Sequence, residues 1–273
     1  MTSTASLPKR WRRRISARRD LLLSVLLLIL MLGGWELFID IFDISRLVLP
    51  KPSAIALSLW SGLVYGNLLH HAAVTFYETI AGFGIGAVTG LVLGGFIGQF
   101  PVLERTLYPY VVAFQTVPKV AIAPIFVVWF GFGTTSKVVV TATIAFFPVL
   151  ANAIVGLRSA PADQIEMLQT LTADRRQIFW KVRMWQALPY ILVGLDVAIV
   201  LSVIGAIVGE FVGAQAGLGY MILQRDLSMD MAGVFAILVI LSVMGVGLHL
   251  VIRHLQHRVV FWMPQNGGWT TGA

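Results

Sequence analysis

Residues 75–100 read TFYETIAGFGIGAVTGLVLGGFIGQF, an apolar stretch in which Glu78 is the one charged residue. About 20 consecutive apolar residues are enough for a helix to cross the hydrocarbon core of a bilayer. Glycine recurs at every fourth position, at Gly82, Gly86, Gly90, Gly94 and Gly98. On a helix of about 3.6 residues per turn, this spacing keeps the glycines on one slowly drifting face. The stretch therefore predicts a membrane helix whose glycine face another helix can approach closely.

The composition and five further apolar segments indicate the same class of protein. The 273 residues are 58% hydrophobic and 12% charged, whereas a typical soluble domain is about 45–50% apolar and about 25% charged. A soluble globular protein is therefore excluded. We predict an all-α integral membrane protein with six transmembrane helices, the others within residues 20–43, 108–130, 138–157, 189–212 and 232–252. The fifth helix repeats the glycine spacing, and we interpret these residues too as helix-packing positions: Gly205, Gly209 and Gly213.

The first 19 residues carry seven Lys and Arg side chains and precede the first apolar segment. A signal peptide would have a shorter apolar run followed by a small-residue cleavage site. We therefore predict an uncleaved first helix at 20–43 and a basic cytoplasmic N-terminus at 1–19. In this orientation fifteen of the 20 Lys and Arg residues are cytoplasmic and four are outside. This distribution follows the positive-inside rule, places both termini in the cytoplasm and explains the net charge of +7 without nucleic acid as a partner.

Segments between the predicted spans carry further expectations. Residues 44–74 form an outer loop, in which Ser53–Tyr65 is predicted to be a short surface helix. Residues 214–231 are apolar but too short to cross, which indicates a re-entrant or interfacial turn. Residues 158–188 form the longest cytoplasmic loop, and residues 261–273 form a C-terminal tail that we expect to be disordered from Gly267.

The cytoplasmic loop has the pattern of a helical hairpin. Ser159, Pro161 and Asp163 are a capping residue, a first-turn proline and a first-turn acid, which together favour a helix start. Asp174 offers a new N-cap, and the helix after it has an apolar face opposite its basic residues. Two interpretations remain open: a basic amphipathic segment on anionic lipid, or a docking element for a partner protein.

The sequence offers no catalytic or metal-binding set. It contains no cysteine, and no motif of a hydrolase, a metalloprotease or a P-loop ATPase occurs. His254 and His257 lie one helical turn apart, but no third ligand is nearby in the sequence. We therefore predict no catalytic residue, metal or cofactor in this chain, so that ATP hydrolysis would require another subunit.

Lys119 is a basic residue within a predicted span, between Pro118 and Pro124. A cation in the middle of a membrane is costly, and prolines free backbone groups that need a cavity or a neighbouring helix. Lys119 could therefore line a translocation pathway and favour an anionic solute. It could also extend to the cytoplasmic interface, or pair with Asp196 or Glu210.

Three motifs within residues 75–260 resemble one family. EMLQTLTADRRQIF at 166–179, with ALP at 187–189, is similar to the EAA loop of ABC importer permeases. QTVPKVAIAP at 115–124 and WFGFGTTSK at 129–137 look like the signature of the nitrate/sulfonate/taurine branch, and so does Glu210 followed by GLGY at 217–220. The loop departs from the family pattern where alanines, a glycine and a proline are replaced by Met167, Leu168, Thr172 and Trp185.

The resemblance implies the type I ABC importer permease fold, with a first helix and a five-helix core at 75–260 that includes a coupling loop at 158–188. It implies a homodimer in the inner membrane, two cytoplasmic ATPase subunits that bind ATP and Mg, and a periplasmic or lipid-anchored solute-binding protein. The permease would move a small solute, expected to be a sulfonate such as taurine, a nitrate or an organic acid, by alternating access.

The resemblance also assigns residues to these roles. The residues expected to couple the permease to the ATPase are Asp163, Glu166, Leu171, Thr172, Ala173, Arg175, Arg176 and Phe179. Those expected to form the pathway or its gate are Gln115, Pro118, Lys119, Pro124 and Glu210. The alternative is a proton-coupled secondary transporter that uses Glu210, which would usually carry an internal repeat; the sequence shows none.

Overall fold

The computed structural model describes residues 9–262, with side chains described for Asp20 and for residues 22–262. Within this range the chain is helical and has no strand, which confirms the all-α prediction. Five of the described helices are long and apolar enough to cross a membrane, and a bent pair makes six if it counts as one span. Residues 1–8 and most of the predicted C-terminal tail, including the disorder expected from Gly267, lie outside the described residues.

The chain divides into two compact units. The first consists of the described residues up to Tyr65 together with Arg225–Ala236. It contains α1 (Lys9–Ile41), whose segment Leu22–Ile41 is a candidate span. It also contains α2 (Pro52–Val64), which confirms the short helix predicted in the outer loop. Proline suits the first turn of α2 because the N–H group it lacks would have no partner within the helix.

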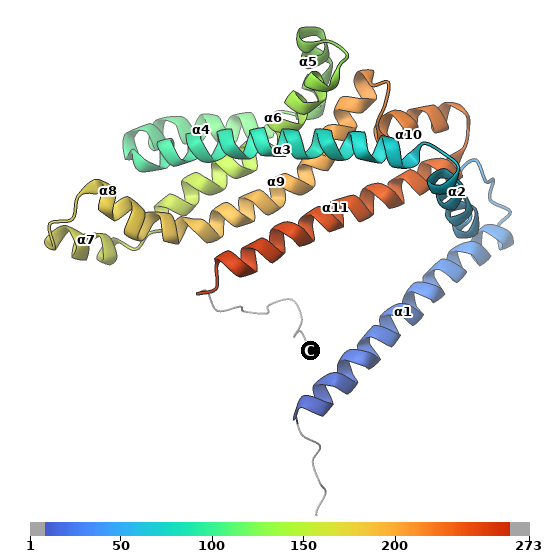
Figure 1. Cartoon of the computed structure of the whole chain (residues 1–273), viewed down its shortest axis with the longest axis horizontal. Coiled ribbons are helices and arrows are strands. Elements are labelled where there is room, and N and C mark those ends of the chain that lie inside the picture. Colours follow the sequence, from blue (N-terminus) through green and yellow to red (C-terminus); the bar gives the residue numbers. More distant parts are fainter. Residues whose placement is uncertain (1–8, 263–273) are drawn as a thin grey trace, which may run out of the picture. The chain divides into compact units, whose positions relative to one another are not determined.

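The second unit consists of Gly66–Gln224 and the described residues from Ile237. Its core is formed by α3 (Leu68–Gln99), α6 (Thr134–Arg158) and α9 (Met184–Gly213), which contact one another (Figure 1). Small residues fill the space between these helices, with Ala145, Val149 and Ala198 fully buried. The helix α3 begins before the predicted start at residue 75, because a helix can continue through the polar residues that flank an apolar run.

The glycine face of α3 lies against α6. A Cβ atom at Gly90 would lie 2.9 Å from the backbone oxygen of Phe146 and 3.0 Å from Cβ of Val149. The other α3 glycines of the series face α6 in the same way: Gly82, Gly86, Gly94 and Gly98. In α9, Cβ atoms at Gly205 and Gly209 would lie 3.0 Å from Cα of Thr141 and Lys137 of α6. Helix backbones can approach this closely only where side chains are missing.

The third predicted span, expected at 108–130 with two helix-breaking prolines, is broken in the structure. The structure has α4 (Pro101–Thr116), the short 3-10 helix η1 (Lys119–Ile122) and α5 (Ala123–Phe130). The second part is bent by 80° from α4, and Figure 1 shows α5 turned away from the line of α4. Pro118 is the reason, because the residue before a proline avoids helical geometry, and Val117 is extended with ψ 129°.

The loop at 158–188 forms a hairpin, but its second helix continues into the core. The hairpin contains α7 (Ala162–Thr170) and α8 (Arg175–Ile178), and the π-helical turn η2 (Phe179–Arg183) joins α8 to α9. The second helix of the hairpin and the span predicted at 189–212 are therefore one helical segment, Arg175–Gly213. Residues 175–188 contain no proline, and Pro189 removes one N–H group without ending α9.

The start of the hairpin also differs from the predicted cap. Pro161, not Ser159, is the residue that precedes α7, and it makes no side-chain cap. Ser159 ends α6 instead, because its hydroxyl group donates to the backbone oxygen of Gly156 (2.7 Å). The predicted acid at Asp163 does lie in the first turn of α7, where a negative charge is favourable.

Two more helices complete the described chain. The helix α10 (Leu218–Leu227) occupies most of the segment 214–231, for which we expected a re-entrant or interfacial turn. The helix α11 (Met231–Val259) is a candidate span. Within the second unit, His249 of α11 contacts Asp196 of α9 with 2.6 Å between the side-chain atoms Nδ1 and Oδ1.

Candidate coupling and translocation sites

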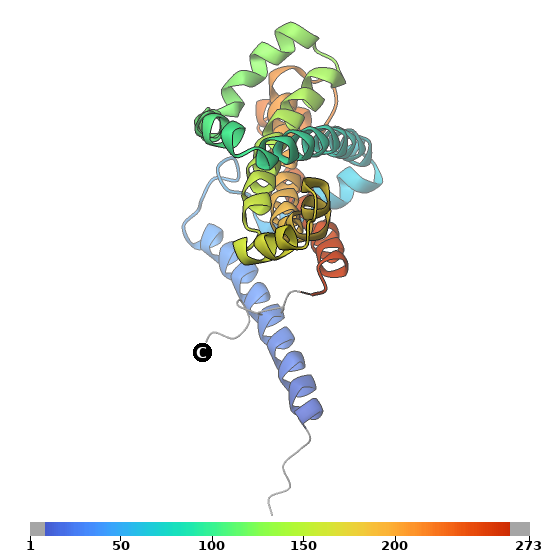
Figure 2. The same cartoon turned by 90° about the vertical axis from the view of Figure 1, so that its left-hand side faces the viewer.

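The coupling residues predicted from the sequence lie on a hairpin at the ends of α6 and α9, which faces the viewer in Figure 2. The turn between α7 and α8 closes the end of α7 with two backbone hydrogen bonds. The N–H of Ala173 donates to the oxygen of Leu168 (3.0 Å), and the N–H of Thr172 donates to that of Gln169 (2.9 Å). This is a Schellman motif, whose residue after the C-cap adopts a left-handed conformation and is usually glycine. Thr172 takes that position with φ 60°, so the turn forms although the family glycine is missing.

The start of α8 is fixed by a reciprocal pair of hydrogen bonds. Asp174 Oδ1 accepts from the N–H of Gln177 (2.6 Å), and the Gln177 side chain accepts from the N–H of Asp174 (3.1 Å). This capping box satisfies two backbone donors that the helix itself leaves unpaired. It confirms the N-cap predicted at Asp174.

Most of the coupling residues expose their side chains, so that a partner could contact them. Leu171 is 68% exposed although it is apolar. The other exposed members are Asp163, Glu166, Thr172, Arg175 and Arg176, whereas Ala173 and Phe179 are half-buried. A hairpin with fixed ends and exposed tips is suited to docking, because little conformational entropy is lost when it binds.

The pathway residues predicted in the third span lie at the break between α4 and α5. Gln115, Pro118 and Pro124 are exposed, and Lys119 is half-buried. The Lys119 ammonium group donates to the backbone oxygen of Gln115 (2.8 Å) and lies 4.9 Å from the ring centroid of Phe147. The first contact satisfies a carbonyl group in the last turn of α4. Among the described residues Lys119 forms no ion pair, and so the pairing considered with Asp196 or Glu210 is absent there.

Glu210 does not lie with the other predicted pathway residues. It is 1% exposed, and its carboxylate accepts hydrogen bonds from the Thr75 hydroxyl group (2.6 Å) and the N–H of Gly219 (2.5 Å). Thr75 in turn accepts from the N–H of Leu218 (2.7 Å). The His71 ring nitrogen Nδ1 accepts from the N–H of Gly217 (2.9 Å). Side chains of α3 and α9 thus accept hydrogen bonds from the first backbone N–H groups of α10.

A buried ion pair lies beside this network, and sequence reasoning did not find it. Glu78 Oε1 is 3.9 Å from Lys137 Nζ, and the two side chains are almost completely buried between α3 and α6. Glu78 forms no hydrogen bond among the described residues. The signal was in the sequence, since residues 71, 75, 78 and 82 recur at helical spacing. Polar residues therefore extend the glycine face of α3.

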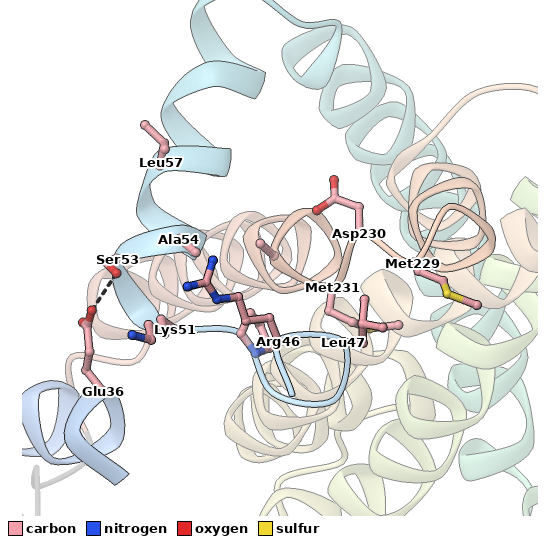
Figure 3. Close-up of a pocket in the computed structure, with 12 residues that line it drawn as sticks. Glu36, Arg46, Leu47, Lys51, Ser53, Ala54, Leu57, Met229, Asp230 and Met231 are labelled. Atoms are coloured by element: carbon pink, nitrogen blue, oxygen red, sulfur yellow. Dashed lines mark hydrogen bonds between the residues drawn. The ribbon is translucent and has the colours of Figure 1, made fainter. Parts of the chain in front are cut away.

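The first unit contains a cavity of about 530 Å³ between the end of α1, the start of α2 and the turn before α11 (Figure 3). Glu36 accepts a hydrogen bond from Ser53 (2.6 Å), and Lys51 pairs with Asp40. Arg46 is among the lining residues and points into the cavity. The other lining residues are apolar or are acids that already have a hydrogen-bonding or ionic partner. Positive and negative side chains are both present, so neither sign of charge dominates the cavity.

Comparisons with known protein sequences identify the family of this chain. Residues 86–261 match the family described as binding-protein-dependent transport system inner membrane component. The chain is 38% identical to the formylaminopyrimidine transport permease protein ThiX of Halalkalibacterium halodurans, over 70% of this chain and 77% of the relative. It is 32% identical to the putative aliphatic sulfonates transport permease protein SsuC of Bacillus subtilis, over 92% of this chain and 90% of the relative.

A solved structure supports the fold. A chain of the MetNI methionine ABC transporter in inward-facing conformations aligns with a TM-score of 0.55 and 22% identity, covering 77% of this chain and 98% of that chain. The type I importer permease fold expected from the sequence is thereby confirmed. With the family match over more than half of its length, the chain belongs to the binding-protein-dependent transport system inner membrane components and is a multi-span membrane permease of an ABC importer for small solutes.

Proposed function

We propose that this permease forms the translocation pathway of an ATP-driven importer and works by alternating access. The observation that carries the proposal is the continuity of α8, η2 and α9, which together form one helical segment, Arg175–Gly213, of 39 residues. A displacement of the hairpin is therefore passed along the helix to α9 and from there to α3 and α6. The π-helical turn η2 lies within this segment, and such turns often occur at functional sites.

The proposed assembly contains two copies of the permease, two cytoplasmic ATPase subunits that bind ATP and Mg, and an outer solute-binding protein. The hairpin and both chain termini are cytoplasmic in this arrangement, as the distribution of Lys and Arg favours. The first helix at 20–43 is separate in role from the core at 75–260. The exposed coupling residues would enter a groove on the ATPase, with Glu166 at the contact and Arg175 and Arg176 at its rim.

The solute is proposed to be a small anion such as a sulfonate, nitrate or organic acid. The support is Lys119, whose ammonium group is half-buried beside the broken span without an ion pair among the described residues. Relatives are named for solutes of different chemistry, formylaminopyrimidine and aliphatic sulfonates. The proposal that the solute is an anion therefore rests on Lys119. Proton coupling through Glu210 is not favoured, because the Glu210 carboxylate accepts two hydrogen bonds that hold α10.

The test of coupling replaces Glu166 by Lys in the complete transporter. We expect fewer ATPase subunits to co-purify and ATP-driven uptake into proteoliposomes to fall about tenfold, since a reversed charge at a contact costs roughly 1–2 kcal/mol. The matched control is Gln164→Lys, which adds the same side chain about 200° around α7. Equal co-purification and uptake in Glu166→Lys and the unchanged protein would show that α7 does not couple transport to ATP.

A further inference from the structure

Two adjoining cavities lie between the hairpin and the corner where α3 gives way to α4. Their volumes are about 340 Å³ and 210 Å³. Pro101, Ile165 and Arg183 line both, so we treat them as one groove. The groove lies at the ends of α3, α6 and α9, since Gln99, Arg158 and Arg183 mark those ends. It therefore lies where apolar spans end and polar loops begin.

The groove is strongly cationic. Arg105, Arg158, Arg175 and Arg183 line it, and the one acid in its lining is Glu104. Glu104 is buried and already pairs with Arg158 at 2.6 Å. Within residues 22–262, where side chains are described, Arg105, Arg175 and Arg183 form no ion pair and no side-chain hydrogen bond. Three guanidinium groups thus surround a concave space without a counter-charge.

The remaining lining suits an amphiphile rather than a bare ion. Phe100, Ile178 and Phe179 provide apolar surface beside the arginines. Trp185 does not line the groove but follows Arg183 by two residues. It is 54% exposed and packs edge-to-face on Trp262, with centroids 5.2 Å apart. Exposed tryptophans are enriched at the level of lipid headgroups. The groove therefore combines charge for a phosphate with apolar surface for the glycerol and upper acyl chains.

We propose that this groove binds the phosphate of an anionic phospholipid. Guanidinium groups form paired hydrogen bonds with phosphate oxygens, and basic pockets between membrane helices are known to take such headgroups. A protein partner is the less favoured occupant, because Arg183 is half-buried. The apolar lining residues also lie at the ends of the spans rather than on the exposed face of α7. The lipid bridges α8 and the α3–α4 corner, so it holds the hairpin against the core.

The proposal goes beyond the coupling function and is tested on the permease alone. The purified chain in detergent is incubated with phosphatidylglycerol or phosphatidylcholine, and retained lipid is counted by native mass spectrometry. We expect preferential retention of phosphatidylglycerol, and at least about a tenfold weaker affinity for it in Arg175→Gln/Arg183→Gln. The matched control, Arg176→Gln/Lys181→Gln, removes two charges from the same helical segment at positions that do not line the groove.

The other possible outcomes would each contradict the lipid proposal or test it with a second variant. Equal weakening in both double variants would mean unspecific attraction, and the proposal would be wrong. Inorganic phosphate that displaces the lipid at equal affinity would identify a site for free anions instead. Unchanged retention of phosphatidylglycerol in Arg175→Gln/Arg183→Gln would mean that these arginines do not bind lipid, and the proposal would be wrong. If the glutamine variant fails to fold, Arg175→Lys/Arg183→Lys keeps the charge but loses paired hydrogen bonding, and it must still weaken retention.

Discussion

At the scale of single residues, Thr75 links three helices. Its hydroxyl group donates to Glu210 of α9 and accepts from the backbone of Leu218 in α10. Thr75→Val keeps the shape of the side chain but leaves a buried carboxylate oxygen and a buried N–H without their partner. We expect a loss of roughly 1–3 kcal/mol in the free energy of unfolding. The loss should appear as a lower midpoint of thermal unfolding and as faster hydrogen exchange at the start of α10.

A second threonine provides the control for this prediction. Thr141 is as completely buried as Thr75, but its hydroxyl group donates only to the oxygen of Lys137 one turn earlier in its own helix (2.8 Å). Thr141→Val should therefore change stability much less. Equal effects of the two substitutions would mean that the contacts of Thr75 between helices contribute nothing particular.

At the scale of elements, α3 offers two glycines with opposite surroundings. A Cβ atom at Gly90 would collide with the backbone of α6, whereas one at Gly95 would meet nothing within 4 Å. Gly90→Leu should separate α3 from α6 and cost roughly 1–3 kcal/mol or more, because cores tolerate overpacking poorly. Gly95→Leu should fold and transport normally. The measurements are the yield of folded protein in detergent and its unfolding midpoint, and similar values for both variants would contradict the packing.

The turn of the hairpin contains a non-glycine residue in the left-handed region. A β-branched residue in the left-handed region is strained by about 1–2 kcal/mol, and Thr172 occupies that region at φ 60°. Thr172→Gly should relieve the strain and slow hydrogen exchange in α7 and α8, whereas Thr172→Ala retains a Cβ atom and should relieve less of it. Faster exchange in the glycine variant would show that Thr172 contributes contacts that outweigh its strain.

At the scale of the whole molecule, we propose that Lys119 makes the broken span favour anions. Lys119→Met in the complete transporter, assayed with its binding protein, should lower uptake of an anionic solute about tenfold, equivalent to about 1.4 kcal/mol. Lys119→Arg keeps the charge and the contact to the end of α4, and it should restore most of the uptake. Lys181→Met removes an exposed Lys elsewhere as a control. Unchanged anion uptake in Lys119→Met would remove Lys119 from the pathway and leave it a role at the end of α4.

The sequence by itself determined the features that depend on local order. Apolar runs fixed most of the candidate spans, glycine spacing fixed the face of α3 that meets α6, and the Asp174 pattern fixed the start of α8. These features are readable because periodicity and capping act between residues a few positions apart. The resemblance of the EAA-like loop and the signature segments supplied the family.

The tertiary structure alone decided the contacts between distant residues. Thr75 and Glu210 are 135 residues apart in the chain, and no local pattern states that their side chains meet. The direction of the bend after Pro118 and the continuity of α8 with α9 were likewise undetermined, because a proline permits a break without fixing its angle. The surroundings of Lys119, Glu78 and the groove arginines depend on how α3, α4, α6 and α9 pack. Packing is set by side chains from all of these helices together, and that is why it appears only in the folded chain.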